Sequence, residues 1–380
     1  MKKLYLLFTI FFLFNISAFA QSELEFKGML TGFTNYGAEG EYPMWSGARY
    51  IPELGYDFTF DSLQSFSIEA SANIYGSVQY PHENGAEWDG YVKPYRLWAR
   101  YKYKNTELRV GLQKIDFGSS TLLRPIQWFN EIDPRDPLGL TNGINAALAR
   151  YYFSNNANLW LWTLYGNEGR RGYDLLESDK KSPEFGGRFQ YPVPKGELAF
   201  TYHHRNATLD SFDEELNPLF IETIENKWGL DGKWDVGVGL WFEATYTKQN
   251  QNIGMLTNQS LVNLGTDYTF GLGNGLNVVL EHLSGFYGEE FNKTDYKTNT
   301  TATSLAYPIG FFDNISTMMY YDWGTEKAGF FISYDHQFNL FTTYLMLYYN
   351  PTAEETPFQT NDLSQMSPGF GARVMLVYNH

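Results

Sequence analysis

The stretch FSIEASANIYGSVQ, residues 66–79, alternates apolar and polar side chains over nearly its whole length. Ile68 and Ile74 belong to the apolar set, and Ser67 and Glu69 belong to the polar set. Because successive side chains of a β-strand point to opposite faces, a period of two predicts one strand with an apolar and a polar face. Strands of soluble β-sandwiches usually span about five or six residues. This segment therefore indicates a β-protein with much longer strands.

The same alternation recurs from Leu24 to the end of the chain, in runs of about ten residues separated by connections. Residues 56–60 and 236–246 are clear examples. Many of the apolar faces end in aromatic residues: Tyr80, Tyr101, Tyr103, Tyr202, Phe270, Tyr307, Trp323 and Phe338. Aromatic rings at the ends of an apolar face are typical of the girdles of membrane-spanning β-barrels.

The connections alternate between short and long. Short turns lie near residues 61–62, 104–105, 155–156, 192–196, 235, 271–275, 308–313 and 339. Longer connections lie near 37–44, 81–87, 118–146, 167–182, 206–223, 249–257, 286–298 and 350–366, with one short exception near 324–327. Short turns at one end and long loops at the other are typical of outer-membrane barrels. The alternation predicts an all-β fold, a single transmembrane antiparallel up-and-down β-barrel of about 18 strands (16 to 18), with both termini on the periplasmic side.

The composition agrees with this fold class. Aromatic residues make up 18% of the 380 residues, and there is no cysteine. Outside the N-terminus no apolar run approaches the roughly 18 residues that a spanning helix needs, which excludes a bundle of transmembrane helices. The lack of cysteine excludes disulfide frameworks, zinc ribbons, iron–sulfur clusters and thiol nucleophiles. The formal net charge of -15 argues against nucleic acid as a partner.

The first twenty residues have the order of a secretory signal peptide. Residues 2–3 are lysines, residues 4–14 are apolar, and residues 18–20 read Ala-Phe-Ala, a small-residue cleavage site. A buried N-terminal helix is the alternative, but this segment has neither caps nor a polar face. We therefore predict a cleaved signal peptide at 1–20 and an outer-membrane β-barrel at 21–380. The expected location is the cell outer membrane of a Gram-negative bacterium.

The last segment of the chain alternates again. One face carries Phe370, Ala372, Val374, Leu376 and Tyr378. The segment resembles the aromatic-ended closing strand of outer-membrane barrels, which their assembly machinery recognises. The resemblance implies that the barrel-assembly machinery is a partner through this strand, and it places the C-terminus in the barrel seam.

The segment Gly111–Leu140 departs from the strand pattern and runs for about 29 residues without alternation. Loops of this length are usually functional or disordered. Disorder is excluded by the apolar content, which comprises Leu122, Leu123, Ile126, Trp128, Phe129, Ile132, Leu138 and Leu140. Such side chains need a wall to cover them, and the inner wall of the barrel provides one. We therefore predict an inward-folded long loop that narrows the lumen.

Two motifs in this segment carry a family resemblance. The tripeptide at 111–113, Gly-Leu-Gln, is followed by FNEIDPRDP at 129–137. Over residues 108–155 this resembles porin-like outer-membrane barrels of an uncharacterised group related to alginate-export and phosphate-selective porins. The resemblance implies a one-chain barrel with a lumen-facing loop and does not identify a substrate. The residues alone leave a second interpretation open, since Asp-Pro at 133–134 and 136–137 is also ordinary turn chemistry.

Charged side chains are expected on the inner wall. By parity, five arginines face the lumen: Arg96, Arg100, Arg109, Arg150 and Arg188. Carboxylates face it largely from the other strands: Asp57, Glu69, Glu243, Asp267, Glu281, Asp322 and Asp335. The predicted pore-lining and constriction residues are the five arginines, Glu69 and five loop residues, Arg124, Glu131, Asp133, Arg135 and Asp136.

Arg100 and Arg109 fall nearly opposite each other across a turn. Like charges in that arrangement destabilise a strand pair unless an anion or a carboxylate lies between them. One hypothesis places these arginines on an ion path. The alternative is that they only pair with Glu69 or with the acids of the long loop.

No other motif of a catalytic, metal or nucleotide site is present in the sequence. The six histidines are scattered, and the sequence has no HExxH, GxSxG or Walker motif. We therefore expect no catalytic residue, no cofactor, no metal site and no enzymatic activity.

The strand count favours a channel, because a barrel of about 16 to 18 strands leaves an aqueous lumen. We predict an outer-membrane porin-like channel for passive diffusion of small hydrophilic solutes or ions. One alternative is a barrel component of secretion or surface assembly with a plugged lumen, and another is an outer-membrane enzyme with a site assembled from distant strands. The expected partners are outer-membrane lipid and small hydrophilic solutes, and a homo-oligomer is compatible with the sequence.

Overall fold

The structure is a computed structural model that describes residues 21–39, 42–81, 85–212, 218–351 and 366–380. The predicted signal peptide lies outside the described residues. Within them, no helix is long and apolar enough to cross a membrane.

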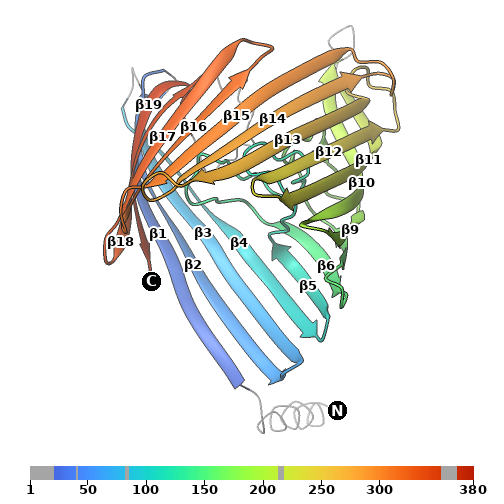
Figure 1. The fold of residues 1–380 in the computed structure, drawn as a ribbon, viewed down its shortest axis with the longest axis horizontal. Helices are drawn as coiled ribbons and strands as arrows, with labels where there is room; N and C mark the ends of the chain where they lie inside the picture. Colours follow the sequence, from blue (N-terminus) through green and yellow to red (C-terminus); the bar gives the residue numbers. More distant parts are fainter. Residues whose placement is uncertain (1–20, 40–41, 82–84, 213–217, 352–365) are drawn as a thin grey trace.

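Within the described residues, nineteen strands follow one another along the chain, and Figure 1 shows their arrangement. They are β1 (Gln21–Gly37), β2 (Met44–Asp61), β3 (Gln64–Tyr80), β4 (Glu87–Tyr103), β5 (Thr106–Gln113), β6 (Ile144–Tyr152), β7 (Asn158–Leu164), β8 (Glu177–Ser178), β9 (Glu184–Val193), β10 (Gly196–Phe212), β11 (Pro218–Asp235), β12 (Gly239–Gln249), β13 (Asn258–Phe270), β14 (Leu276–Gly288), β15 (Tyr296–Pro308), β16 (Asp313–Asp322), β17 (Lys327–Gln337), β18 (Phe341–Asn350) and β19 (Gly369–Asn379).

The strands form a closed ring. Each strand pairs antiparallel with its neighbours in sequence, except that β7 pairs directly with β9. The two-residue strand β8 pairs only with β10 and lies outside the ring. The first and last strands pair over Met29↔Asn379 to Gly37↔Gly371, which closes the barrel. The ring therefore has 18 strands, and the predicted fold class is confirmed.

The two faces of each strand separate as the alternation requires. On β3 the apolar residues Ile68 and Ile74 are 39% and 40% exposed, whereas the polar residues Ser67 and Asn73 are only 3% and 2% exposed. A closed barrel has one outer and one inner surface, so the exposed apolar side chains form the outer surface and the polar ones form the inner wall. This inverts the arrangement of a soluble protein and suits a barrel surrounded by lipid.

The connections at the two ends differ as the sequence predicts. Eight turns of two to five residues join β2–β3, β4–β5, β6–β7, β9–β10, β11–β12, β13–β14, β15–β16 and β17–β18. The first strand begins and β19 ends at this same end. Lys104 and Lys195 lie in two-residue turns with φ of 49° and 60°, the left-handed region that tight hairpins require.

The C-terminal residue extends the seam by one pair. The backbone N–H groups of Gly28 and His380 each donate to the carbonyl oxygen of the other residue, at 3.0 Å. The His380 ring contacts Phe26, with a centroid distance of 5.5 Å, and its Nε2 lies 3.0 Å from the Tyr50 hydroxyl. The predicted closing strand is therefore the last strand of the ring.

Candidate functional site: the barrel lumen and its inward loops

The long connection between β5 and β6, residues 114–143, lies inside the barrel (Figure 1). We call it the first inward loop. Most of its apolar side chains are fully or almost fully buried: Leu122, Leu123, Ile126, Trp128, Phe129, Ile132 and Leu140. The predicted inward-folded loop is therefore confirmed, and the wall that covers these side chains is the inner wall of the barrel.

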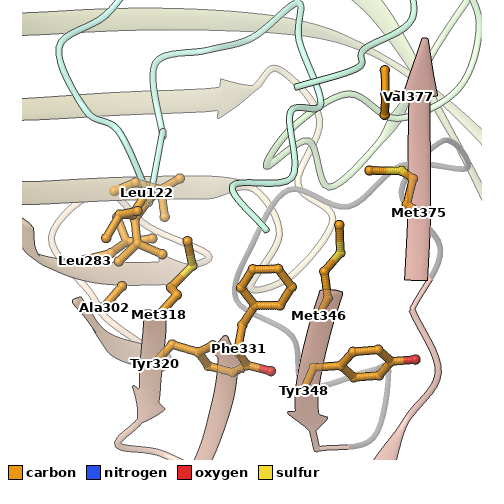
Figure 2. Close-up of a cluster of buried hydrophobic side chains, with 12 residues drawn as sticks. Leu122, Leu283, Ala302, Met318, Tyr320, Phe331, Met346, Tyr348, Met375 and Val377 are labelled. Atoms are coloured by element: carbon orange, nitrogen blue, oxygen red, sulfur yellow. The ribbon is translucent and has the colours of Figure 1, made fainter. Parts of the chain in front are cut away.

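The first inward loop contacts the wall on three sides. Near its start, Phe117 stacks on Trp162 of β7 with a centroid distance of 5.7 Å. At its middle, Leu122 packs beside Leu283 of β14 (Figure 2). Near its end, Leu140 packs against Ile51 of β2. The loop therefore crosses the lumen instead of lining one side.

Glu281 of β14 holds the middle of this loop through backbone hydrogen bonds. Its Oε1 accepts from the N–H groups of Thr121 and Leu122 at 2.7 and 3.2 Å. Its Oε2 accepts from the N–H of Leu123 at 2.6 Å. A side-chain amide of β13, that of Asn263, donates both to the Leu123 carbonyl at 2.8 Å and to Glu281 at 3.1 Å. A carboxylate suits this place because it only accepts hydrogen bonds.

Glu243 of β12 holds the same loop on either side of that contact. Its carboxylate accepts from the N–H groups of Ser119, Ser120 and Ile126 at 2.6, 2.8 and 3.1 Å. Gly118 has a φ of 104°, and a Cβ there would lie 2.7 Å from the Glu243 carboxylate. A residue with a side chain would therefore push the loop away from the wall.

Asp133 and Asp136, two acids of the loop motif, form hydrogen bonds with other groups of the protein. Asp133 and Arg135 form a buried pair in which both carboxylate oxygens accept from the guanidinium, at 2.9 and 2.8 Å. Arg135 also donates to Asn350 of β18 at 2.7 Å. Asp136 accepts from the backbone N–H groups of Leu138 and Leu140 at 3.0 and 3.1 Å, and burial raises the pKa of its carboxyl group. These contacts favour turn chemistry as the role of the two Asp-Pro pairs.

Arg124 and Glu131, the two other predicted loop residues, form hydrogen bonds within the loop. The Arg124 guanidinium donates to the Thr121 carbonyl at 2.8 Å and to Gln127 at 3.2 Å. The backbone N–H of Glu131 donates to the Thr141 hydroxyl at 3.0 Å. Both residues are partly exposed, so their side chains remain reachable from the lumen.

The connection between β7 and β9, residues 165–183, also enters the lumen, and we call it the second inward loop. Asp174 of this loop forms ion pairs with Arg205 of β10, at 2.7 Å, and with Lys227 of β11. Leu176 is fully buried, and the carbonyl of Tyr173 accepts from Gln259 of β13 at 3.2 Å. The sequence pattern indicated only a long polar loop here.

Buried charges behind the second inward loop are matched with one another. Arg205 donates to Glu225 at 2.5 Å, and Arg171 donates to Glu184 at 2.6 Å. The indole N–H of Trp162 donates to Nδ1 of His203 at 3.2 Å, so the proton of the neutral imidazole lies on Nε2 and points to Glu184 at 3.0 Å. These residues form a filled structural network.

Three of the predicted lumen arginines lie together on neighbouring strands. Arg100 and Arg109 are direct partners across β4 and β5, as the sequence predicts. Arg150 of β6 is the direct partner of Glu107. The carboxylate of Glu107 lies 3.3 Å from the guanidinium groups of both Arg109 and Arg150. Glu107 is thus a candidate functional residue that was not among the acids predicted to face the lumen.

The other predicted wall residues lie apart from these three. Arg96 is buried and donates to the carbonyl of Thr141 at 2.9 Å. Arg188 is buried and donates twice to Asp231, at 2.6 and 2.8 Å. Glu69 of β3 is half-buried, and among the described residues no ion pair joins it to a lumen arginine.

Several charged groups of the lumen are engaged within the protein itself. Among the described residues no group of three or more His, Asp or Glu side chains could hold a metal ion. The wall carboxylates Glu243 and Glu281 are occupied by loop N–H groups, and His203 is buried in the structural network. What the lumen offers a solute is a loop across its width and a partly exposed basic wall.

No family model and no curated protein matches the chain. Solved structures do match it. The in-vitro folded trimer form of OmpT, an outer membrane protein of Vibrio cholerae, gives a TM-score of 0.52 at 8% identity, over 94% of this chain and 99% of that chain. A loop L8 deletion mutant of OmpT gives 0.50 at 8% identity, over 94% and 99%. This likeness is one of fold, that of an outer-membrane β-barrel. The narrower resemblance to alginate-export and phosphate-selective porins stays a prediction.

Proposed function

We propose that the protein is a porin-like channel in the outer membrane of a Gram-negative bacterium, through which small hydrophilic solutes or ions diffuse passively. One observation supports this most: a loop crosses the lumen of an 18-strand barrel and is held there by wall carboxylates. Barrels of this strand number enclose an aqueous lumen, and an inward loop sets its width. Passage in this mechanism requires neither energy coupling nor a catalytic step.

Planar-bilayer recording tests the proposal. The full mature chain, refolded in detergent, is expected to insert with discrete, ohmic current steps that increase with salt concentration. Stable insertion without current would contradict the channel. The same recording measures the width through the conductance of one step, and the charge preference through the reversal potential in a salt gradient.

A second candidate is a barrel component of secretion or surface assembly. The observation that favours it is the second inward loop, since two loops and a matched set of buried charges occupy part of the lumen. In that case the lumen is plugged and the long loops bind a partner. Insertion without current, together with capture of a second component that depends on those loops, would support this candidate over the channel.

The first prediction concerns export and closure of the barrel. Cleavage after Ala20 should leave Gln21 as the first residue, and the mature chain should fractionate with outer membranes. Because a closed barrel satisfies its strand hydrogen bonds internally, the unheated protein should migrate faster than the boiled protein in a denaturing gel. An intact mass that retains Met1 in an inserted chain would contradict cleavage, and equal migration would contradict the closed barrel.

The second prediction concerns charge selectivity. The mature chain should show weak cation selectivity, because the 43 acidic residues of the sequence outnumber the 28 basic ones and acids on the surface loops concentrate cations at the mouth. Replacing Arg100 and Arg109 by Ser should move the reversal potential, in a salt gradient of about tenfold, further toward cations, since two positive charges leave the wall. The control is Lys293→Ser, which changes an exposed lysine of the outer connection between β14 and β15. A double variant that matches the parent would place both arginines off the ion path.

A further inference from the structure

Arg100, Arg109 and Arg150, which we call the arginine cluster, lie on three adjacent strands, and two of them contact one buried carboxylate. Arg100 and Arg109 are direct cross-strand partners, and Arg150 is the direct partner of Glu107. Glu107 precedes Arg109 by two residues and therefore lies on the same face of β5. Two positive charges thus share a single buried negative charge, and a third lies beside one of them.

The charge of the cluster is not balanced by its neighbours. Glu107 is 5% exposed and is shared between Arg109 and Arg150, at 3.3 Å from each. The carboxylate nearest to Arg100 is that of Asp57, at 4.0 Å, and its side chain is 65% exposed. Solvent screens an exposed pair at that distance, so Asp57 contributes little. Glu69 of β3 also interacts electrostatically with Arg109, but no ion pair joins the two among the described residues. Within ion-pair distance, three arginines therefore face two carboxylates, and one positive charge is in excess.

Two other buried arginines of the lumen have a different pairing with carboxylates. Arg188 donates hydrogen bonds to both oxygens of Asp231, and Arg135 donates to both oxygens of Asp133. At these two positions a whole carboxylate matches one buried arginine. In the cluster, by contrast, Arg109 and Arg150 both donate to the same oxygen of Glu107, and Arg100 donates to the Ser67 hydroxyl at 3.0 Å.

Two indole rings hold the guanidinium groups in place without using their donors. The guanidinium carbons of Arg109 and Arg100 lie 4.7 and 5.5 Å from the ring centroid of Trp98. That of Arg150 lies 3.8 Å from the ring centroid of Trp160. A ring face attracts the cation but accepts no in-plane hydrogen bond, so N–H groups stay available for a ligand.

We propose that the arginine cluster is a binding site for a small oxyanion that carries two negative charges. The side chains of Arg100, Arg109 and Arg150 are 29%, 16% and 13% exposed, so a solute in the lumen can reach them. An oxyanion with several oxygens accepts the paired N–H groups of guanidinium in a forked geometry and supplies the missing charge. The role of this site in transport rests on the proposed channel function. In such a channel, the site would define the class of solute that passes.

Sulfate is the first probe, because its charge does not change near neutral pH, and succinate is the second. The full chain is refolded in detergent, and binding is followed by tryptophan fluorescence, to which Trp98 and Trp160 contribute, and by titration calorimetry. Sulfate should bind saturably, and chloride at equal ionic strength should not reproduce the signal. Arg109→Gln and Arg150→Gln should each weaken binding at least tenfold, which corresponds to about 1.4 kcal/mol. Arg170→Gln, on an exposed loop position, should bind as the parent does.

Glu107→Gln separates a binding site from a lattice of ion pairs. Loss of the competing carboxylate should tighten sulfate binding, whereas a structural lattice would be damaged in the same way as by Arg109→Gln. Arg109→Lys, which keeps the charge, should bind better than Arg109→Gln and serves if the latter misfolds, as checked by migration of the unheated protein. No saturable sulfate signal beyond chloride, or weaker binding by Glu107→Gln, overturns the site. Binding in detergent needs no conduction, so sulfate binding without current contradicts the channel and leaves the site standing.

Discussion

Deleting residues 122–140 is expected to raise single-channel conductance several-fold while the barrel still inserts. The deleted part contains the contacts with β14 and with β2 that carry the first inward loop across the lumen. Because β5 and β6 are adjacent strands, the eleven loop residues that remain can still join them. With no loop across its width, the pore is limited by the wall alone. The conductance of single steps in a planar bilayer measures the change.

The control for this deletion removes residues 290–294, an exposed part of the connection between β14 and β15. This shorter outer loop has no contact with the lumen clusters, so its removal should leave the step size unchanged. A 122–140 deletion variant that inserts and keeps the parent conductance would show that the loop does not limit the ion path.

Replacing Glu281 by Gln, alone and together with Glu243→Gln, is expected to loosen the first inward loop. An amide has one acceptor oxygen, and its NH2 group faces N–H groups of the loop that need acceptors. A buried donor left without a partner costs about 1 to 3 kcal/mol, and Glu281 alone serves three backbone donors. The temperature at which the unheated gel form converts to the boiled form should therefore fall, and the current should fluctuate more within single steps.

The matched control is Glu222→Gln, an exposed glutamate of β11 for which no comparable loop contact exists among the described residues. It should convert at the temperature of the parent and show steady current. If the Glu281 and Glu243 variants also behave like the parent, their carboxylates do not hold the loop, and its apolar contacts with the wall suffice.

The sequence was sufficient to predict the barrel and its inward loop. Alternation with a period of two separates lipid-facing from lumen-facing side chains on each strand, and the eight short turns place the strand ends. The first inward loop was visible because Leu122, Trp128 and Phe129 break the pattern with apolar side chains that need a cover.

The hydrogen bonds and ion pairs inside the lumen could not be predicted from the sequence pattern. Glu243 and Glu281 were placed on the inner wall, but their partners are backbone N–H groups, which have no mark in the sequence. The second inward loop is polar, and Asp174 is buried only because Arg205 and Lys227 face it from other strands. Pairing across distant strands depends on register and closure, which a single sequence does not specify.

The wall acids that hold the first inward loop also set an order of events during biogenesis. Glu243 and Glu281 follow their loop partners by 117 to 160 residues. An incomplete barrel that lacks β12 and β14 therefore carries the loop without these acceptors. The loop takes its final position only after β12 and β14 have joined the sheet. Contacts between such remote parts of a chain slow folding, so we expect the seating of this loop to be a slow step of maturation.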